Sequence, residues 1–255
     1  MRLLFVGDIV GASGRAVVKR YLPELIVNQQ IDFVIANGEN AAHGKGITPK
    51  IANELLAVGI EMITLGNHAY SKKDVLEIDS SIPLVFPANM EGARRSLSTR
   101  VVEIKGLRLA ISNILTQVFM DYVDENPFDV MEDILEEVDA DLYFVDLHGE
   151  ATSEKIAFAY YFKDHLIAVC GTHTHVQTAD ERIIDGCAFI TDVGMSGPFD
   201  SVIGRDVQEV LDRLVHNKHT RYTVADTDSM LCAVIIEIDE ISKRSTSIER
   251  VQIRP

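Results

Sequence analysis

Residues 99–113 read TRVVEIKGLRLAISN, and this segment decides between two α/β architectures. Two runs rich in β-branched and aliphatic residues, RVVEI at 100–104 and RLAIS at 108–112, flank Lys105 and Gly106. Two such runs around a short glycine-containing turn predict an antiparallel hairpin. A purely doubly wound sheet has no place for this hairpin, so we expect a mixed sheet, or two packed sheets with helices outside.

On both sides of the hairpin, short apolar runs alternate with helix-compatible segments. The expected strands are residues 2–7, 32–37, 61–66, 83–88, 100–104, 108–112, 141–148, 165–171, 187–192 and 231–239. The expected helices are residues 15–29, 49–58, 72–78, 128–138, 153–162 and 205–215. Strand–helix alternation from the N-terminus predicts parallel strands with crossover helices in the first three units. No repeat or Pro/Ser-rich linker divides the chain, so we expect one domain over residues 1–255.

Composition excludes several classes of function. The chain has 255 residues, 47% of them hydrophobic, and a formal net charge of -15. Broad nucleic-acid binding needs clustered Lys and Arg, so it is not expected. No apolar run approaches the roughly 20 residues of a membrane span, and the N-terminus reads as a strand rather than a signal peptide. With three cysteines and no C-x-x-C, we expect reduced, buried thiols and a cytoplasmic protein, whether monomer or homo-oligomer.

Polar side chains follow five of the expected strands. They are Asp8, Glu39 with Asn40, Asn67 with His68, His148, and His173 with His175. In open α/β sheets, ligands bind beyond the carboxyl ends of parallel strands, so we expect these residues to converge on one site. The triplet His-Thr-His at 173–175 fits this site because alternate residues of an extended segment lie on one face.

The chemistry of this set predicts bound metal. Carboxylates, amide oxygens and imidazoles without thiolate suit Mn, Fe or Zn as a hydrolytic ion. Seven potential ligands exceed the needs of one tetrahedral ion, whereas two ions bridged by a carboxylate would use them, as in phosphatases and nucleases. Taken alone, each residue could also have a purely structural role. Asp8 or Asn67 could be a turn residue, Glu39 a helix cap, and His148 a hydrogen-bonded core histidine.

The N-terminal glycines suggest a second function, that of a dinucleotide-binding oxidoreductase. GDIVGASGR at 7–15 is a glycine-rich strand-to-helix turn, and Glu39 follows the second strand as a ribose-binding acid would. The fingerprint G-x-G-x-x-G fails, because Gly7, Gly11 and Gly14 are spaced four and three apart. These glycines more simply allow a tight turn and close packing.

The motifs GNH (66–68) and GTHTH (171–175) together resemble the calcineurin-like metallophosphoesterases. The usual D-x-H of that family is here Asp8, Ile9 and Val10, and its bridging Asp is Glu39. With these departures the chain is similar to the YmdB-like family through FVGDIVG, NGENAAHGKGIT, LHGEATSEK, GTHTHVQTAD and TDVGMSGPFDSVIG, almost over its whole length. Ala69 and Tyr70 stand where the family leads us to expect a threonine and a tryptophan, a change in the pocket wall.

This resemblance implies a fold, a ligand set and an activity. The fold is a four-layer α-β-β-α sandwich with two mixed sheets. One metal would be bound by Asp8, Glu39, Asn40 and His175, and the other by Glu39, Asn67, His148 and His173. Glu39 would bridge two divalent or trivalent ions, with Fe or Mn expected first and Zn as an alternative. The expected substrate is a small phosphoester, foremost a 2′,3′- or 3′,5′-cyclic nucleotide, with general phosphatase activity as a further alternative.

The mechanistic hypothesis is that both ions depress the pKa of a bridging water, whose hydroxide attacks phosphorus in line. His68 would act as general acid on the leaving oxygen, a role that the resemblance supports; its alternative is to orient the phosphate. Residues 195–206 form either a substrate loop or an ordinary connection. A different class of function also stays open: a metal-binding regulatory or partner-binding protein with little catalysis.

Overall fold

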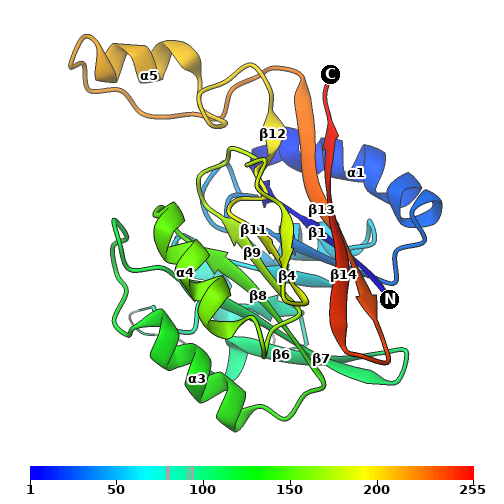
Figure 1. The fold of residues 1–255 in the computed structure, drawn as a ribbon. Coiled ribbons are helices and arrows are strands. Elements are labelled where there is room, and N and C mark those ends of the chain that lie inside the picture. Colours follow the sequence, from blue (N-terminus) through cyan, green and yellow to red (C-terminus); the bar gives the residue numbers. More distant parts are fainter. Residues whose placement is uncertain (79–80, 91, 93–94) are drawn as a thin grey trace.

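Two β-sheets pack face to face in a computed structural model that describes residues 1–78, 81–90, 92 and 95–255. Leu3, Phe5 and Ile35 of one sheet meet Ile111 and Phe144 of the other in the central apolar layer. Helices cover both outer faces, as Figure 1 shows for α3 and α4 on one side and α1 on the other. The four layers and the two mixed sheets confirm the expected fold class.

The first sheet begins with the expected parallel units. Strands β1 (Arg2–Val6), β3 (Phe33–Asn37), β4 (Met62–Thr64) and β5 (Leu84–Val85) are parallel neighbours. The long strand β13 (Ser229–Asp239) then pairs antiparallel with the other edge of β1, and this pairing makes the sheet mixed. The sheet is completed by β14 (Arg244–Ile253), β12 (Met195–Pro198) and β2 (Asp8–Ile9).

The second sheet is built outward from the predicted hairpin. Strands β6 (Thr99–Ile104) and β7 (Leu107–Leu115) pair antiparallel around Lys105 and Gly106, whose φ angles of 52° and 81° suit a two-residue turn. Beyond β7, the parallel strands β8 (Leu142–His148), β9 (Ala168–Thr172) and β11 (Cys187–Ile190) follow, with β10 (Arg182–Ile184) at the edge.

Five α-helices are described where the sequence predicts them. They are α1 (Gly11–Asn28), α2 (Pro49–Leu56), α3 (Pro127–Glu137), α4 (Thr152–Phe162) and α5 (Val207–Leu214). The helix expected over 72–78 is wrong in type: Lys73–Glu77 forms a 3₁₀-helix, as does Arg95–Leu97. So short a segment supports only i→i+3 hydrogen bonds such as the one from Val75 N to Lys72 O.

Four strands were not predicted. Strands β2, β10 and β12 have two to four residues each, too few for a period-2 pattern to stand out. Strand β14 has ten residues, but its three apolar side chains, Ile248, Val251 and Ile253, do not follow a regular period-2 pattern, and much of the strand is exposed at the sheet edge beside β13. The three cysteines are free and buried, as expected. No helix among the described residues could span a membrane.

Two glycines of the N-terminal turn permit the close packing that the sequence predicts. A Cβ on Gly7 would lie 2.0 Å from the carbonyl oxygen of Gly194, and one on Gly14 would lie 2.3 Å from that of Ser196. Both contacts are to the backbone of the segment that forms β12, which cannot move aside without breaking its pairing with β2. These glycines therefore hold helix α1 and β2 against β12, and Asp8 is part of β2.

We expect Gly14→Ala to lower the free energy of unfolding by about 1–3 kcal/mol, because the added methyl overpacks a rigid backbone contact. The measurement is urea denaturation followed by circular dichroism. Ala12→Ser, on the exposed side of the same helix, is the control and should change stability by no more than about 0.5 kcal/mol. Equal stability of the two variants would contradict the packing argument.

Candidate metal centre

The eight polar residues that follow strands β1, β3, β4, β8 and β9 lie at one edge of the molecule. This is so because the carboxyl ends of β1, β3 and β4 in one sheet face those of β8 and β9 in the other. Direct contacts link all seven predicted ligands and His68. The convergence of these residues on one place is thus as predicted, while their binding of metal stays a prediction.

One group of donor atoms surrounds His148. Its Nε2 lies 3.0 Å from Oδ1 of Asn67, 3.1 Å from Nδ1 of His173 and 3.4 Å from Oε1 of Glu39. One ligand atom from each of Glu39, His148 and His173 falls within a span of 4.8 Å. Atoms this close can coordinate one cation together. The grouping matches one of the two ligand sets that the sequence implies.

A second group lies on the other side of Glu39. His175 Nε2 is 3.2 Å from Nδ2 of Asn40 and 3.8 Å from Oδ1 of Asp8, and Asn40 Nδ2 donates to Oε1 of Glu39 at 3.0 Å. The Oδ1 atom of Asp8 is buried and has no hydrogen-bond partner. A buried carboxylate oxygen without a partner is costly, and a cation at this place would remove the cost. The residues present therefore fit a second metal ion.

The extended conformation expected for the histidine pair is wrong. Strand β9 ends at Thr172, and His173 and His175 are not extended, with φ angles of 102° and 66°. Their rings reach neighbouring donor groups because the backbone turns at both residues, not because alternate strand residues share a face. Non-glycine residues at positive φ are strained, and they persist where surrounding contacts hold them.

A buried ion pair holds this strained turn. Lys155 of α4 and Asp192, both fully buried, form an ion pair at 3.3 Å. Lys155 Nζ also donates to the carbonyl oxygen of Thr172 at 2.7 Å, and Oδ2 of Asp192 accepts from the backbone N–H of Thr174 at 2.9 Å. The pair thus fixes the backbone on both sides of His173. Sequence analysis missed it, although Asp192 ends the strand predicted over 187–192 and obeys the same strand-end rule as the ligands.

Asp146 fixes the tautomer of His148. Thr172 Oγ1 donates to Oδ1 of Asp146 at 2.6 Å, and the same oxygen lies 2.8 Å from Nδ1 of His148. Since the threonine hydroxyl has only one proton and gives it to the carboxylate, it must accept from Nδ1–H. The lone pair of His148 is therefore on Nε2, the nitrogen that faces Glu39 and Asn67, as a metal ligand requires.

Burial without compensating charge perturbs every ionisable group of the centre. Burial raises the pKa of Asp8 to about 7, with Asp192 adding to the rise, and raises the pKa of Glu39 well above its usual value, with Asp8 adding to it. Burial likewise lowers the pKa of His148 well below its ordinary value, and His173 lowers it further. Such a cluster prefers to be neutral by itself, and bound cations would restore its carboxylates.

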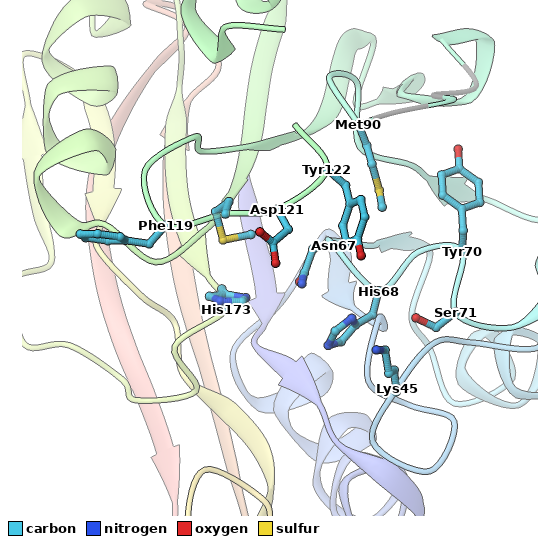
Figure 2. A pocket seen from close by; sticks show the side chains of 11 residues that line it. Lys45, Asn67, His68, Tyr70, Ser71, Met90, Phe119, Asp121, Tyr122 and His173 are labelled. Carbon is cyan, nitrogen blue, oxygen red and sulfur yellow. The ribbon is translucent and has the colours of Figure 1, made fainter. Parts of the chain in front are cut away.

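Positive side chains line the opening of the centre. A cavity of about 250 Å³ is lined by Glu39, Asn40, His68, Glu150, His173, Thr174, His175, Ile203 and Arg205. It joins a larger one of about 580 Å³, where Lys45 and His68 lie side by side (Figure 2). Neither Lys45 nor Arg205 forms an ion pair with any residue that the structure describes. In a chain of net charge -15, two unpaired cations, one lining each of two cavities that share His68 and His173, favour an anionic ligand.

The segment 195–206 takes part in the site. The carbonyl oxygen of Ile203 accepts a hydrogen bond from Nδ1 of His175 at 2.9 Å, which turns Nε2 of that ring toward Asp8. Arg205 lines the cavity and donates to the carbonyl oxygen of Gly44 at 3.0 Å. The segment therefore contacts the candidate centre, while its role as a substrate loop stays a prediction. Tyr70 also lines the larger cavity and stacks on Phe86, with ring centroids 5.5 Å apart.

We expect Lys155→Met to lower the free energy of unfolding by about 3–5 kcal/mol, because it leaves the carboxylate of Asp192 buried without its cation. Denaturant unfolding of metal-free protein measures the loss. Adding Asp192→Asn to this variant should recover part of it. Lys218→Met breaks an exposed ion pair with Asp212 and is the control, expected to cost at most about 1 kcal/mol. If Lys155→Met costs no more stability than the control, the buried ion pair of Lys155 and Asp192 does not stabilise the turn at His173.

Comparison with known proteins agrees over the whole chain. A 2′,3′-cyclic-nucleotide 2′-phosphodiesterase of Bacillus subtilis (strain 168) is 42% identical over 257 aligned residues, 99% of this chain and 97% of that protein. The crystal structure of a novel phosphatase of Mycoplasma pneumoniae superposes with a TM-score of 0.93 at 36% identity, over 100% of this chain and 93% of that one. A hypothetical protein from Thermus thermophilus gives a TM-score of 0.92 at 35% identity, with both chains fully covered.

A family model agrees with these likenesses. The model described as YmdB-like protein matches residues 4–251, and that range includes all seven predicted ligands and His68. The likeness is therefore not confined to a shared fold, since it extends through the segments that carry the site. The chain belongs to the YmdB-like protein family.

Proposed function

We propose that this protein is a binuclear metal-dependent phosphoesterase whose substrates are cyclic nucleotides, the 2′,3′-cyclic and also the 3′,5′-cyclic forms. The observation that supports it most is the contact between seven nitrogen- and oxygen-bearing side chains at one opening, with Oδ1 of Asp8 buried and unpartnered. The cations beside this opening favour phosphate, and the name of the Bacillus relative supports a cyclic phosphodiester as the bond cleaved.

Two ligand sets would share Glu39. Asp8, Glu39, Asn40 and His175 would hold one ion, and Glu39, Asn67, His148 and His173 the other. The donors are carboxylate, amide and imidazole groups with no thiolate among them, which favours Mn or Fe. When bound, such a pair of ions supplies an acidified water and positive charge next to the phosphoryl group.

The residues at the opening would bind the phosphate and supply the proton that the leaving oxygen needs. Lys45 and Arg205 would attract the phosphate, since neither charge is neutralised by a carboxylate in the described parts of the chain. Burial, together with the smaller effects of the nearby Lys45 and His173, lowers the pKa of His68 to about 4. An anionic substrate between these groups would oppose that shift, so His68 would gain its proton together with the substrate and give it to the leaving oxygen.

Replacing the shared ligand should remove both metal and activity. Purified protein loaded with Mn or Fe should hold about two ions per chain by elemental analysis. Glu39→Gln should lose bound metal and turnover of bis-p-nitrophenyl phosphate, because Glu39 contacts both groups of ligands. His165→Ala, at an exposed histidine, is the matched control and should keep both. Wild-type protein that binds metal and hydrolyses no phosphodiester would favour the regulatory, partner-binding alternative.

His68 is tested by varying the leaving group. His68→Ala should lower kcat by roughly 10²–10⁴ on 2′,3′-cyclic AMP, whose ribose oxygen needs a proton, and far less on bis-p-nitrophenyl phosphate, whose phenolate does not. Metal content should stay at the wild-type value. An equal loss on both substrates would assign His68 to phosphate orientation instead.

Metal affinity should rise with pH through neutrality. The carboxyl of Asp8 has a pKa of about 7 without metal, so below pH 7 a proton occupies the group that the ion needs, and above it the carboxylate is free. Calorimetric titration with Mn²⁺ from pH 6 to 8 should show tighter binding at the higher pH, with proton release that shrinks as pH rises. The same titration of Asp8→Asn should show a weaker pH dependence and release fewer protons than the wild type, with Glu39 accounting for what remains. Binding that is independent of pH in the wild type would argue against Asp8 as a ligand.

A further inference from the structure

The loop between β7 and α3 exposes two aromatic side chains next to the candidate metal centre. Phe119 is 86% exposed and Tyr122 is 67% exposed, and both have left-handed backbone, with φ angles of 63° and 65°. Exposure of large rings and positive φ at bulky residues are each unfavourable. Their occurrence together in one loop indicates a binding role rather than a packing role.

This loop is held at both ends, so the exposure is not that of a free segment. At its start, the backbone N–H groups of Gln117 and Val118 donate to the carboxylate of Glu154 at 2.8 and 2.9 Å. At its end, Val123 forms an isolated β-bridge with Met90, and Asp124 N donates to the carbonyl oxygen of Asn89 at 3.0 Å. The loop thus presents Tyr122 from a fixed frame.

Tyr122 forms a wall of the larger cavity, which has a volume of about 580 Å³. Figure 2 shows its ring between Met90 and the pair Asn67 and His68, whereas the ring of Phe119 points away from these groups. Tyr70 and Met120 add further apolar surface to the lining. Asn67, His68 and His173 belong both to this cavity and to the candidate metal centre. A ligand with its reacting group at the centre would therefore extend over the Tyr122 ring.

We propose that this cavity binds the nucleobase of the substrate, stacked on Tyr122, while Lys45 and His68 face its phosphate. The proposal rests on the function proposed above and deepens it. Apolar walls of aromatic and methionine side chains suit a flat base, and a ribose phosphate alone would leave them uncovered. Stacking on an aromatic ring tolerates every base, so Tyr122 selects nucleotides over base-free phosphodiesters rather than one base over another.

Kinetics on substrates with and without a base test the proposal. The substrates are 2′,3′-cyclic AMP and glycerol 1,2-cyclic phosphate, which share the five-membered cyclic diester. Tyr122→Ala should lower the ratio of kcat/KM for the nucleotide to that for the glycerol ester about tenfold or more, mainly through KM. Tyr122→Phe keeps the ring and should keep the ratio. Tyr160→Ala, at an exposed tyrosine of α4, is the control. An unchanged ratio in Tyr122→Ala overturns the proposal.

Fluorescence tests binding without turnover. The chain has no tryptophan, so Tyr122→Trp places a single reporter at the proposed platform. Adding 2′,3′-cyclic AMP should quench its emission, glycerol 1,2-cyclic phosphate should not, and Tyr160→Trp should respond to neither. If nucleotide concentrations that saturate hydrolysis cause no quenching, stacking on the ring at position 122 is refuted, while the proposed function is not. Quenching by a protein that hydrolyses neither substrate keeps the base site and rejects the proposed function.

Discussion

A buried carboxylate, Asp146, joins the two sheets beneath the candidate metal centre. From the first sheet it accepts hydrogen bonds from Asn37 Nδ2 at 2.9 Å and Thr64 Oγ1 at 2.6 Å, and from β9 of its own sheet it accepts from Thr172 at 2.6 Å. The central layer between the sheets is otherwise largely apolar, and burial of apolar side chains is non-directional, so it sets no precise alignment. Three hydrogen bonds to one fully buried carboxylate do set it, and the strand ends that carry the candidate ligands lie just beyond.

Acidic and basic side chains occupy different parts of the candidate metal centre. Acidic side chains and neutral histidines form its interior, and Lys155 neutralises Asp192 below it. Lys45 and Arg205 stand at the opening without carboxylate partners among the described residues. An overall charge of -15 would repel a phosphoester, so attraction needs a local source of positive charge such as these two side chains, to which bound cations would add. Burial in the same arrangement raises the pKa of the Asp8 and Glu39 carboxyl groups, a shift that bound cations would oppose.

The candidate metal ligands and the proposed recognition residues come from different parts of the chain. The candidate ligands follow strands of the two central sheets, whose positions are fixed by ladders on both sides. The loop of Tyr122 and the residues Ile203 and Arg205 lie outside the sheets, although the carbonyl oxygen of Ile203 also orients His175. Tyr70, stacked on Phe86, is part of the same outer wall. This division would allow related proteins to share one reaction while they differ in the substrates that they select.

The sheet class, the order of parallel units and the set of candidate ligands could be predicted from the sequence alone. This was possible because the hairpin at Lys105 and Gly106 and the polar residues after apolar runs are local patterns, and strand ends necessarily share an edge. The sequence did not reveal the short strands, the long edge strand β14 or the 3₁₀ segment, whose patterns are weak or compete with tertiary pairing.

How the site is held and what surrounds it depend on contacts that form only in the folded chain. The turned backbone of His173 and His175 depends on Lys155 and Asp192, which come from other elements. The Nδ1–H tautomer of His148 depends on Thr172 and Asp146 through two hydrogen bonds. The cavity at Tyr122 forms where a loop between β7 and α3 meets residues that follow β4. Such features arise from contacts between distant residues, and no local periodicity encodes them.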